Sequence, residues 1–218
     1  MNHHLTADEA LQRLIEGNER FQRGEPHLSG VARETLTELA RGQHPFATIL
    51  GCSDSRVAPE AIFHAGLGEL FVVRVAGNVL SAEVAGSIQY AVSHLQTPLL
   101  VVLGHEGCGA IQAALATMDH GVQQRSRIQL LVDSILPGLE ALEAGLPPAA
   151  RLAQAVEMNV RRTVRTILDS PEGRARQAEG RVKCVGAIYE IETGCVRFLH
   201  PAIRQAPIPA EPGMNQAL

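Results

Sequence analysis

The stretch FATILGCSDSRV, residues 46–57, joins a short apolar run to a polar ending that carries a thiol, an acid and a base. Two later stretches, ELFVVRVAG (69–77) and PLLVVLGH (98–105), also place an apolar run before glycine or polar residues. Runs of this length are typical of strands that are buried on both faces of a sheet. Helix-like stretches separate the three runs, which predicts βαβ units. We therefore expect an α/β fold with a mainly parallel central β-sheet flanked by helices.

The residues before the first strand are predicted to be helical. Thr6 and Glu9 stand at the spacing of a capping box, and apolar residues then recur at helical intervals as far as Phe21. A second short helix is expected in VARETLTELARG (31–42), which ends on a glycine. Together these segments predict an N-terminal helical arm over residues 1–45.

The residues after the third strand are expected to form a long helical region, then a hairpin, then a tail. KCVGAIYEIETGCVRFL (183–199) has two alternating apolar runs around a turn, which predicts a C-terminal hairpin. The proline-rich residues 203–218 are expected to be extended. A length of 218 residues suits one domain with a sizeable core, so we expect a single α/β domain over residues 1–218.

The composition argues against several classes of partner. The net charge is −4 and only 3% of the residues are aromatic, so we expect no nucleic-acid surface and no binding to an anionic membrane. No segment approaches the ~20 apolar residues of a membrane span. The N-terminus lacks the charged-then-apolar order of a secretory signal, so we expect a cytoplasmic protein.

Cysteine and histidine side chains follow two of the predicted strands, at the point where each strand ends. Cys52 comes directly after the first run, and His105 and Cys108 stand in GHEGCGA (104–110) after the third. Because ligands bind beyond the carboxyl ends of parallel strands, these side chains would meet if the two strands are neighbours. Thiolate and imidazole suit Zn²⁺, and three protein ligands leave the open fourth position of a catalytic site. The sequence predicts one zinc ion per chain, with a cysteine nucleophile and a histidine base as the alternative.

Asp54 and Arg56 bear on whether this zinc site is open. Alternate residues of an extended segment share a face, so Asp54 and Arg56 could pair through two charge-assisted hydrogen bonds. Asp54 then has two possible states. It is either held by Arg56 with the site open, or bound to zinc as a fourth ligand in a closed state.

Taken together, CSDSRV and GHEGCGA resemble the motifs of the β-class carbonic anhydrases. The similarity also takes in GLGELFVVRVAGN, GSIQYAVSHL and GAIYEIETGCVRFL. The resemblance implies that Cys52, His105 and Cys108 are the zinc ligands and that Asp54 and Arg56 form the catalytic dyad. It also implies the activity, a reversible hydration of CO₂ to bicarbonate and a proton by a zinc-bound hydroxide, and a role in carbon utilization.

The same resemblance implies a substrate pocket and an oligomer. Gln43 and Gly109 match positions that line the substrate site, and Phe71 and Tyr90 match an apolar wall that the family completes across a dimer interface. In the family, the N-terminal helix embraces the partner chain. We therefore expect a homodimer, with dimers that can pair into a tetramer.

A non-catalytic bicarbonate pocket, which some members of the family use to shut the enzyme, is not expected here. That pocket needs a tryptophan three residues before the first cysteine ligand, and Ile49 stands at this position. Arg74 and Tyr189 match the other two residues of the pocket. Without the tryptophan, we expect the open state to dominate.

The proton released by the reaction must reach buffer, and the sequence singles out no group for this step. His27, His44 and His64 are considered only because histidine titrates near neutral pH.

Two other functions stay open at the level of the sequence. A related zinc site could hydrolyse CS₂ or COS, because the ligands alone do not define the substrate. A non-catalytic, zinc-stabilised binding protein would keep Asp54 as a permanent fourth ligand. The presence of Arg56 argues against this second alternative, since a permanent ligand needs no competitor for its carboxylate.

Overall fold

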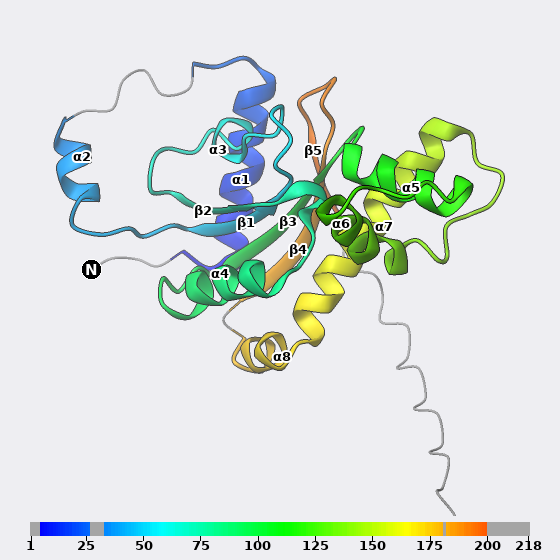
Figure 1. The fold of residues 1–218 in the computed structure, drawn as a ribbon. Helices are drawn as coiled ribbons and strands as arrows, with labels where there is room; N and C mark the ends of the chain where they lie inside the picture. Colours follow the sequence, from blue (N-terminus) through cyan, green and yellow to red (C-terminus); the bar gives the residue numbers. More distant parts are fainter. Residues whose placement is uncertain (1–4, 27–32, 181, 200–218) are drawn as a thin grey trace, which may run out of the picture.

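The computed structural model describes residues 5–26, 33–180 and 182–199. A five-stranded sheet with the strand order β2-β1-β3-β4-β5 runs through the centre of the chain (Figure 1). Strands β1 to β4 are parallel, and β5 pairs antiparallel with β4. This confirms the mainly parallel α/β fold. The strands are β1 (Ala47–Gly51), β2 (Leu70–Arg74), β3 (Leu99–His105), β4 (Lys183–Tyr189) and β5 (Val196–Leu199).

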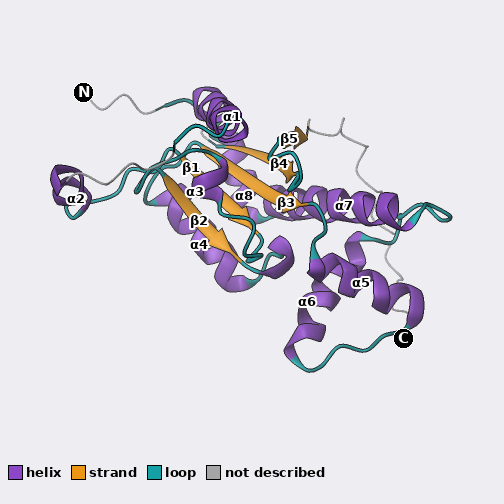
Figure 2. Ribbon diagram, turned by 90° about the horizontal axis from the view of Figure 1, so that it is seen from above, coloured by secondary structure: helices purple, strands orange, loops and turns teal. Residues whose placement is uncertain are grey.

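Helices cover both faces of this sheet (Figure 2). One face carries α1 and α3, and the other carries α4, α5, α6 and α7, with α8 packed on α7. The helices are α1 (Ala7–Gln22), α2 (Arg33–Leu39), α3 (Pro59–Ile62), α4 (Ala82–Ser93), α5 (Gly109–His120), α6 (Arg127–Ile135), α7 (Pro148–Asp169) and α8 (Pro171–Ala178), with 3₁₀ turns η1 (Ala76–Asn78) and η2 (Leu136–Gly138).

The central strand β3 separates two apolar cores. Its side chains alternate, so that Leu100 and Val102 belong to the core under α4 to α7, whereas Val101 and Leu103 belong to the core under α1 and α3. All seven residues of β3 are buried. The uninterrupted apolar run of this strand is therefore explained by burial on both faces.

Helix α1 begins with the predicted capping box. The Thr6 hydroxyl accepts a hydrogen bond from the Glu9 amide, and the Glu9 carboxylate accepts one from the Thr6 amide. The helix packs on the sheet of its own chain through Leu14, which is fully buried. Asn18 attaches it further by donating to the carbonyls of Ile62 and Gly194. Within the chain, α1 is thus part of the core.

Helix α2 lies at the periphery of the chain (Figures 1 and 2), where its last residue, Leu39, packs against Gly68. It is shorter than the predicted segment 31–42, and none of its residues is buried. The Leu36 side chain is half exposed. Of the expected N-terminal arm, α2 is therefore the part that leaves apolar surface uncovered.

The C-terminal hairpin is observed as β4 and β5, while two short helices were not predicted. Helix α8 follows α7 after a break at Ser170, whose hydroxyl caps α8 by accepting from the Gly173 amide. Serine followed by proline is a signal for such a helix start. Helix α3 spans only four residues, too few for a periodic pattern. The tail predicted over residues 203–218 lies outside the described residues.

The close approach of α1 to α3 gives a test of this packing. A Cβ atom on Gly17 would lie 1.9 Å from the backbone oxygen of Phe63, so Gly17→Ala must push the helix away. We expect a loss of about 1–3 kcal/mol in the free energy of unfolding, measured by urea denaturation. Gly86→Ala in α4 is the matched control, because a Cβ there meets no atom within 4 Å. Equal stability of Gly17→Ala and the parent protein would contradict the packing.

Candidate metal centre

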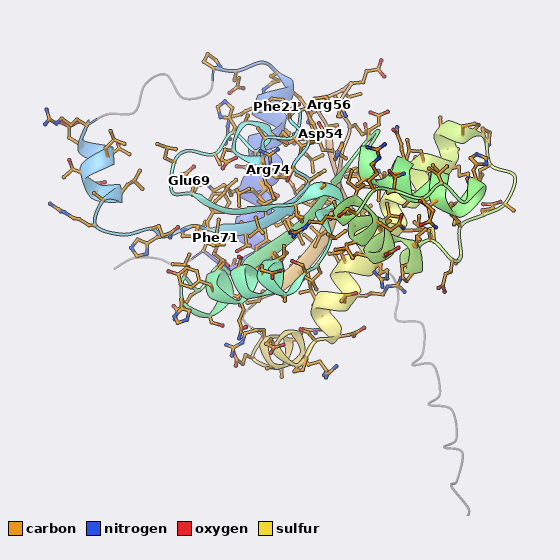
Figure 3. All side chains as sticks on the ribbon, in the orientation of Figure 1. Phe21, Asp54, Arg56, Glu69, Phe71 and Arg74 are labelled. Atoms are coloured by element: carbon orange, nitrogen blue, oxygen red, sulfur yellow. The ribbon has the colours of Figure 1, made fainter. Side chains whose placement is uncertain are left out.

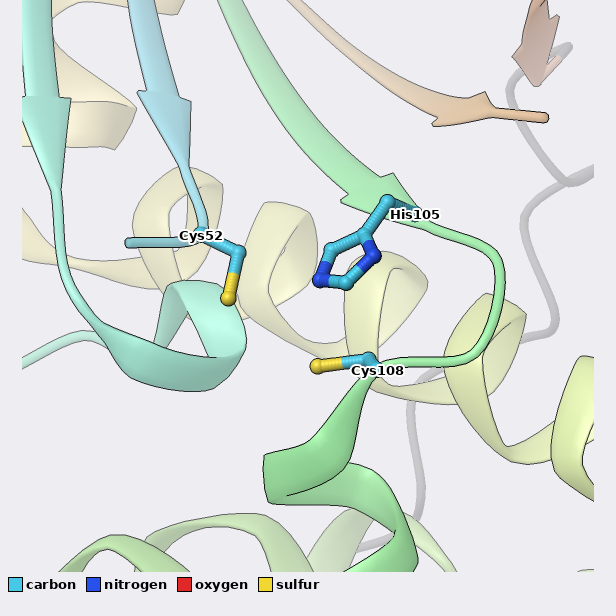
Figure 4. A group of neighbouring side chains, drawn as sticks. All are labelled: Cys52, His105 and Cys108. Atoms are coloured by element: carbon cyan, nitrogen blue, oxygen red, sulfur yellow. The ribbon is translucent and has the colours of Figure 1, made fainter. Parts of the chain in front are cut away.

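The two cysteines and the histidine predicted to bind metal lie together at one edge of the sheet. Cys52 directly follows β1, His105 is the last residue of β3, and Cys108 precedes α5. Strands β1 and β3 are neighbours, so their carboxyl ends meet. The Sγ atoms and a ring nitrogen of the three side chains lie within 4.8 Å of one another, and all three residues are buried. Figure 4 shows the three side chains turned toward a common space.

The hydrogen bonding of His105 leaves one ring nitrogen for a metal. Nδ1 lies 2.9 Å from the carbonyl oxygen of Glu106, which can only accept, so Nδ1 carries the proton. The unprotonated Nε2 is then directed toward the two cysteines, as metal-binding histidines require. Nε2 is buried and has no hydrogen-bond partner among the described residues. A buried nitrogen without a partner is unfavourable, and a bound metal ion would satisfy it.

The two thiols also favour metal binding. The hydrogen bond from Cys108 lowers the pKa of Cys52, while the same contact raises the pKa of Cys108. The Gly77 amide donates to the Cys52 Sγ at 3.3 Å. Cys52 is therefore readily a thiolate, the form of cysteine that binds metals. Two sulfur atoms and one imidazole nitrogen make a donor set that fits zinc.

Asp54 lies at the rim of this cluster in the Arg56-paired arrangement. Its Oδ1 accepts from the Arg56 Nε at 2.9 Å and from the Arg56 amide at 3.0 Å, and its Oδ2 accepts from Nη2 at 2.8 Å. The guanidinium holds the pKa of Asp54 well below its usual range. Oδ2 also lies 3.9 Å from the His105 Nε2. An ionised carboxylate therefore borders the metal cluster without belonging to it.

The structure gives Arg74 a use that the sequence did not indicate. Its Nε donates to the carbonyl of Cys52 at 3.1 Å, and its Nη2 donates to the carbonyl of Asp54 at 2.7 Å. Of the other two positions compared with the bicarbonate pocket, Ile49 is fully buried and Tyr189 packs near the Phe21 ring. Arg74 thus holds the loop that carries Cys52 and the Asp54 carboxylate. Figure 3 shows Arg74 near Asp54 and Arg56.

Three of the four predicted substrate residues form a separate group within the chain. Phe71 pairs with Thr48 in the sheet, four residues before Cys52, which places it about 13 Å away along the strand. Figure 3 shows Phe71 apart from Asp54. Phe71 instead packs near Tyr90, with ring centroids 6.1 Å apart, and Tyr90 lines a pocket with Gln43.

The remaining predicted residues fall in different places. Gly109 begins α5 directly after Cys108, and a Cβ there would meet no atom within 4 Å, so space is open beside the cluster. His44 lines the pocket with Gln43, His64 contacts α1 through Arg20, and His27 lies outside the described residues.

His94, which the sequence analysis did not single out, lies near Tyr90, with a distance of 5.1 Å between the ring centroids. Its position four residues after Tyr90 in a predicted helix was the available signal.

Comparison with known proteins agrees with this geometry. A sequence model of the family described as carbonic anhydrase matches residues 47–196. The chain belongs to the carbonic anhydrase family. Carbonic anhydrase 2 of Mycobacterium tuberculosis is 41% identical over 187 residues, which cover 85% of this chain and 89% of that protein. A carbonic anhydrase of Mycolicibacterium smegmatis is 38% identical over 191 residues, which cover 87% and 91%.

The fold agrees with the β class of carbonic anhydrases. A β-carbonic anhydrase of Sordaria macrospora, one of two described as tetrameric, superposes with a TM-score of 0.68 at 26% identity, covering 75% of this chain and 85% of that chain. The resemblance found in the sequence motifs is therefore confirmed. This carbonic anhydrase is a zinc-dependent lyase that interconverts CO₂ and bicarbonate. None of its described helices has the length and apolar character needed to cross a membrane.

Replacement of one thiol tests the metal centre. Cys52→Ser should lose zinc together with activity, because a hydroxyl is a far weaker zinc ligand than a thiolate. Zinc content after dialysis, measured by atomic emission, is the direct readout. Cys195→Ser is the control, because Cys195 is a free cysteine in the hairpin, away from the cluster. Full retention of zinc by Cys52→Ser would remove Cys52 from the ligand set.

Proposed function

We propose that this carbonic anhydrase hydrates CO₂ at the Cys52–His105–Cys108 centre with Asp54 as the group that orients the attacking water. The observation that carries the proposal is the position of the ionised Asp54 carboxylate, 3.9 Å from the metal-directed nitrogen of His105. A carboxylate at this distance can reach a water molecule at the fourth ligand position.

In this proposal, each residue around the centre has a separate role in the reaction. Zinc, when bound, acts as a Lewis acid that makes water a nucleophile near neutral pH. The Asp54 Oδ2 would accept a hydrogen bond from the reacting water and so orient it toward CO₂. Arg56 keeps the carboxylate ionised and fixed by two side-chain hydrogen bonds and one from its amide. Arg74 keeps the loop itself in place.

We also propose that a second copy of the chain completes each substrate pocket. Gln43, Phe71 and Tyr90 lie together but away from the metal cluster of their own chain, and Tyr90 is 47% exposed. They adjoin β2, an edge strand of the sheet. A partner chain packed on this edge would receive these side chains at its own cluster, beside the open space at Gly109. His94, stacked near Tyr90, would then lie where the released proton must leave.

The oligomeric state and the location belong to the same proposal. A homodimer is the smallest assembly in which both pockets are complete, and the tetramers of the Sordaria macrospora enzymes support a further pairing of dimers. We propose a cytoplasmic location because Cys52 and Cys108 must stay reduced to bind zinc.

Asp54→Asn tests the orienting role. The amide keeps the size of the side chain but presents a donor where the carboxylate accepts, so zinc should be retained and turnover should fall by at least about a hundredfold. Stopped-flow CO₂ hydration on protein of measured zinc content is the assay. Asp119→Asn is a matched control, because Asp119 is also held by two hydrogen bonds from an arginine, Arg151, but lies on α5 away from the cluster.

The outcomes of this assay also separate the alternative functions. Near-normal turnover of Asp54→Asn would refute the orienting role. Stoichiometric zinc with no hydration by the parent protein would favour a zinc-stabilised binding protein. Turnover on CS₂ or COS well above that on CO₂ would favour the hydrolase.

Mixed dimers test whether a second copy completes the pocket. Asp54→Asn and Gln43→Ala chains should each be poorly active alone. When they are refolded together in equal amounts, half of the dimers are mixed, and each mixed dimer has one site with Asp54 from one chain and Gln43 from the other. We therefore expect recovery to about a quarter of the parent activity. Activity no higher than the mean of the two variants would contradict a pocket shared between chains.

A further inference from the structure

The turn η1, which follows β2, has a left-handed backbone conformation beside the metal cluster. Gly77 has φ 69° and the next residue, Asn78, has φ 43°, so two successive residues occupy the left-handed region. Glycine adopts this conformation without strain, whereas Asn78 keeps it only where the surrounding structure holds it in place. Residues that hold this turn are therefore part of what keeps the metal centre in shape.

The turn is enclosed by helices that come much later in the chain. A Cβ atom on Gly77 would lie 3.0 Å from Ala110 of α5 and 3.1 Å from Ile135 of α6, so both helices pack directly on it. From α7, the side chain of Asn159 donates to the Gly77 carbonyl at 2.9 Å. Asn159 is only 2% exposed, so this hydrogen bond is shielded from water. Figure 2 shows α5, α6 and α7 gathered on one side of the molecule.

Gly77 connects Asn159 to the metal cluster through its other polar group. Its amide donates to the Cys52 Sγ at 3.3 Å, and this bond is also buried. One residue thus accepts from α7 at its carbonyl and donates to a metal ligand at its amide. Rotation of the turn would misalign the amide with the sulfur atom.

We propose that Asn159 is a positioning residue of the metal centre, which holds the Gly77 amide on the Cys52 sulfur. The proposal rests on Cys52 being a zinc ligand. A hydrogen bond to a thiolate draws electron density from the sulfur, and partners of this kind commonly change metal affinity by ~10–100-fold when removed. Asn159 acts through Gly77 and touches neither zinc nor substrate.

Asn159→Leu removes the donor and keeps the number and branching of the side-chain heavy atoms, and Thr163→Val is the matched control. Thr163 is buried on α7 one turn further on, at 6% exposure, so its replacement also removes a polar group from this helix face. We expect Asn159→Leu to weaken zinc binding by about tenfold or more in competition with a chelator, and Thr163→Val to change it less than about twofold. If Asn159→Leu does not fold, Asn159→Ser, whose hydroxyl is too short to reach the carbonyl, is measured instead.

Replacement of zinc by cobalt gives an absorption signal that would not change if Asn159 only stabilised the fold. The sulfur-to-cobalt charge-transfer absorption reports electron density on the thiolates, so it should shift in Asn159→Leu and stay unchanged in Thr163→Val. The proposal would be overturned if Asn159→Leu had the zinc affinity and the absorption of the parent protein while its thermal stability was lowered as in Thr163→Val. If instead Cys52 were not a zinc ligand, Cys52→Ser would retain zinc, so that failure can be told apart from failure of the Asn159 proposal.

Discussion

The parallel pairing of β1 with β3 is the constraint on which the rest of this structure depends. It brings together Cys52 and His105, which stand 53 positions apart in the sequence, because the carboxyl ends of adjacent parallel strands meet. The pairing is in turn fixed by burial, since β3 separates two cores and a shift by one residue would exchange its faces. A change that weakens either core therefore affects the metal cluster directly.

Around this pairing, backbone groups carry most of the positioning. The Glu106 carbonyl sets the tautomer of His105, the Gly77 amide reaches the Cys52 sulfur, and Arg74 binds the carbonyls of Cys52 and Asp54. Backbone partners are suited to this task because secondary structure already fixes them. Arg56, by contrast, holds Asp54 mainly by its side chain, which is about half exposed to solvent.

The isolated chain separates its metal cluster from the side chains proposed to enclose substrate. Gln43, Phe71 and Tyr90 gather beside the edge strand β2, and α2 lies at the periphery with Leu36 half exposed. An edge strand with nearby apolar surface is unfavourable in water unless it is covered. Association of two chains would remove this cost and bring the two halves of the pocket together.

The strands, the three candidate metal-binding residues and the pairing of Asp54 with Arg56 could all be predicted from the sequence. Apolar runs identify buried strands because both faces of such a strand are covered by apolar side chains. The cysteine and histidine residues stand directly after these strands, and residues two apart in an extended loop can meet locally. The roles of Arg74 and Asn159 could not be predicted, because Arg74 binds a carbonyl 22 positions earlier in the chain and Asn159 binds one 82 positions earlier. The tertiary structure also decided that α1 packs on its own sheet and that Phe71 lies away from Cys52. Contacts between distant residues depend on how helices pack and how strands are ordered, and no local spacing in the chain specifies either.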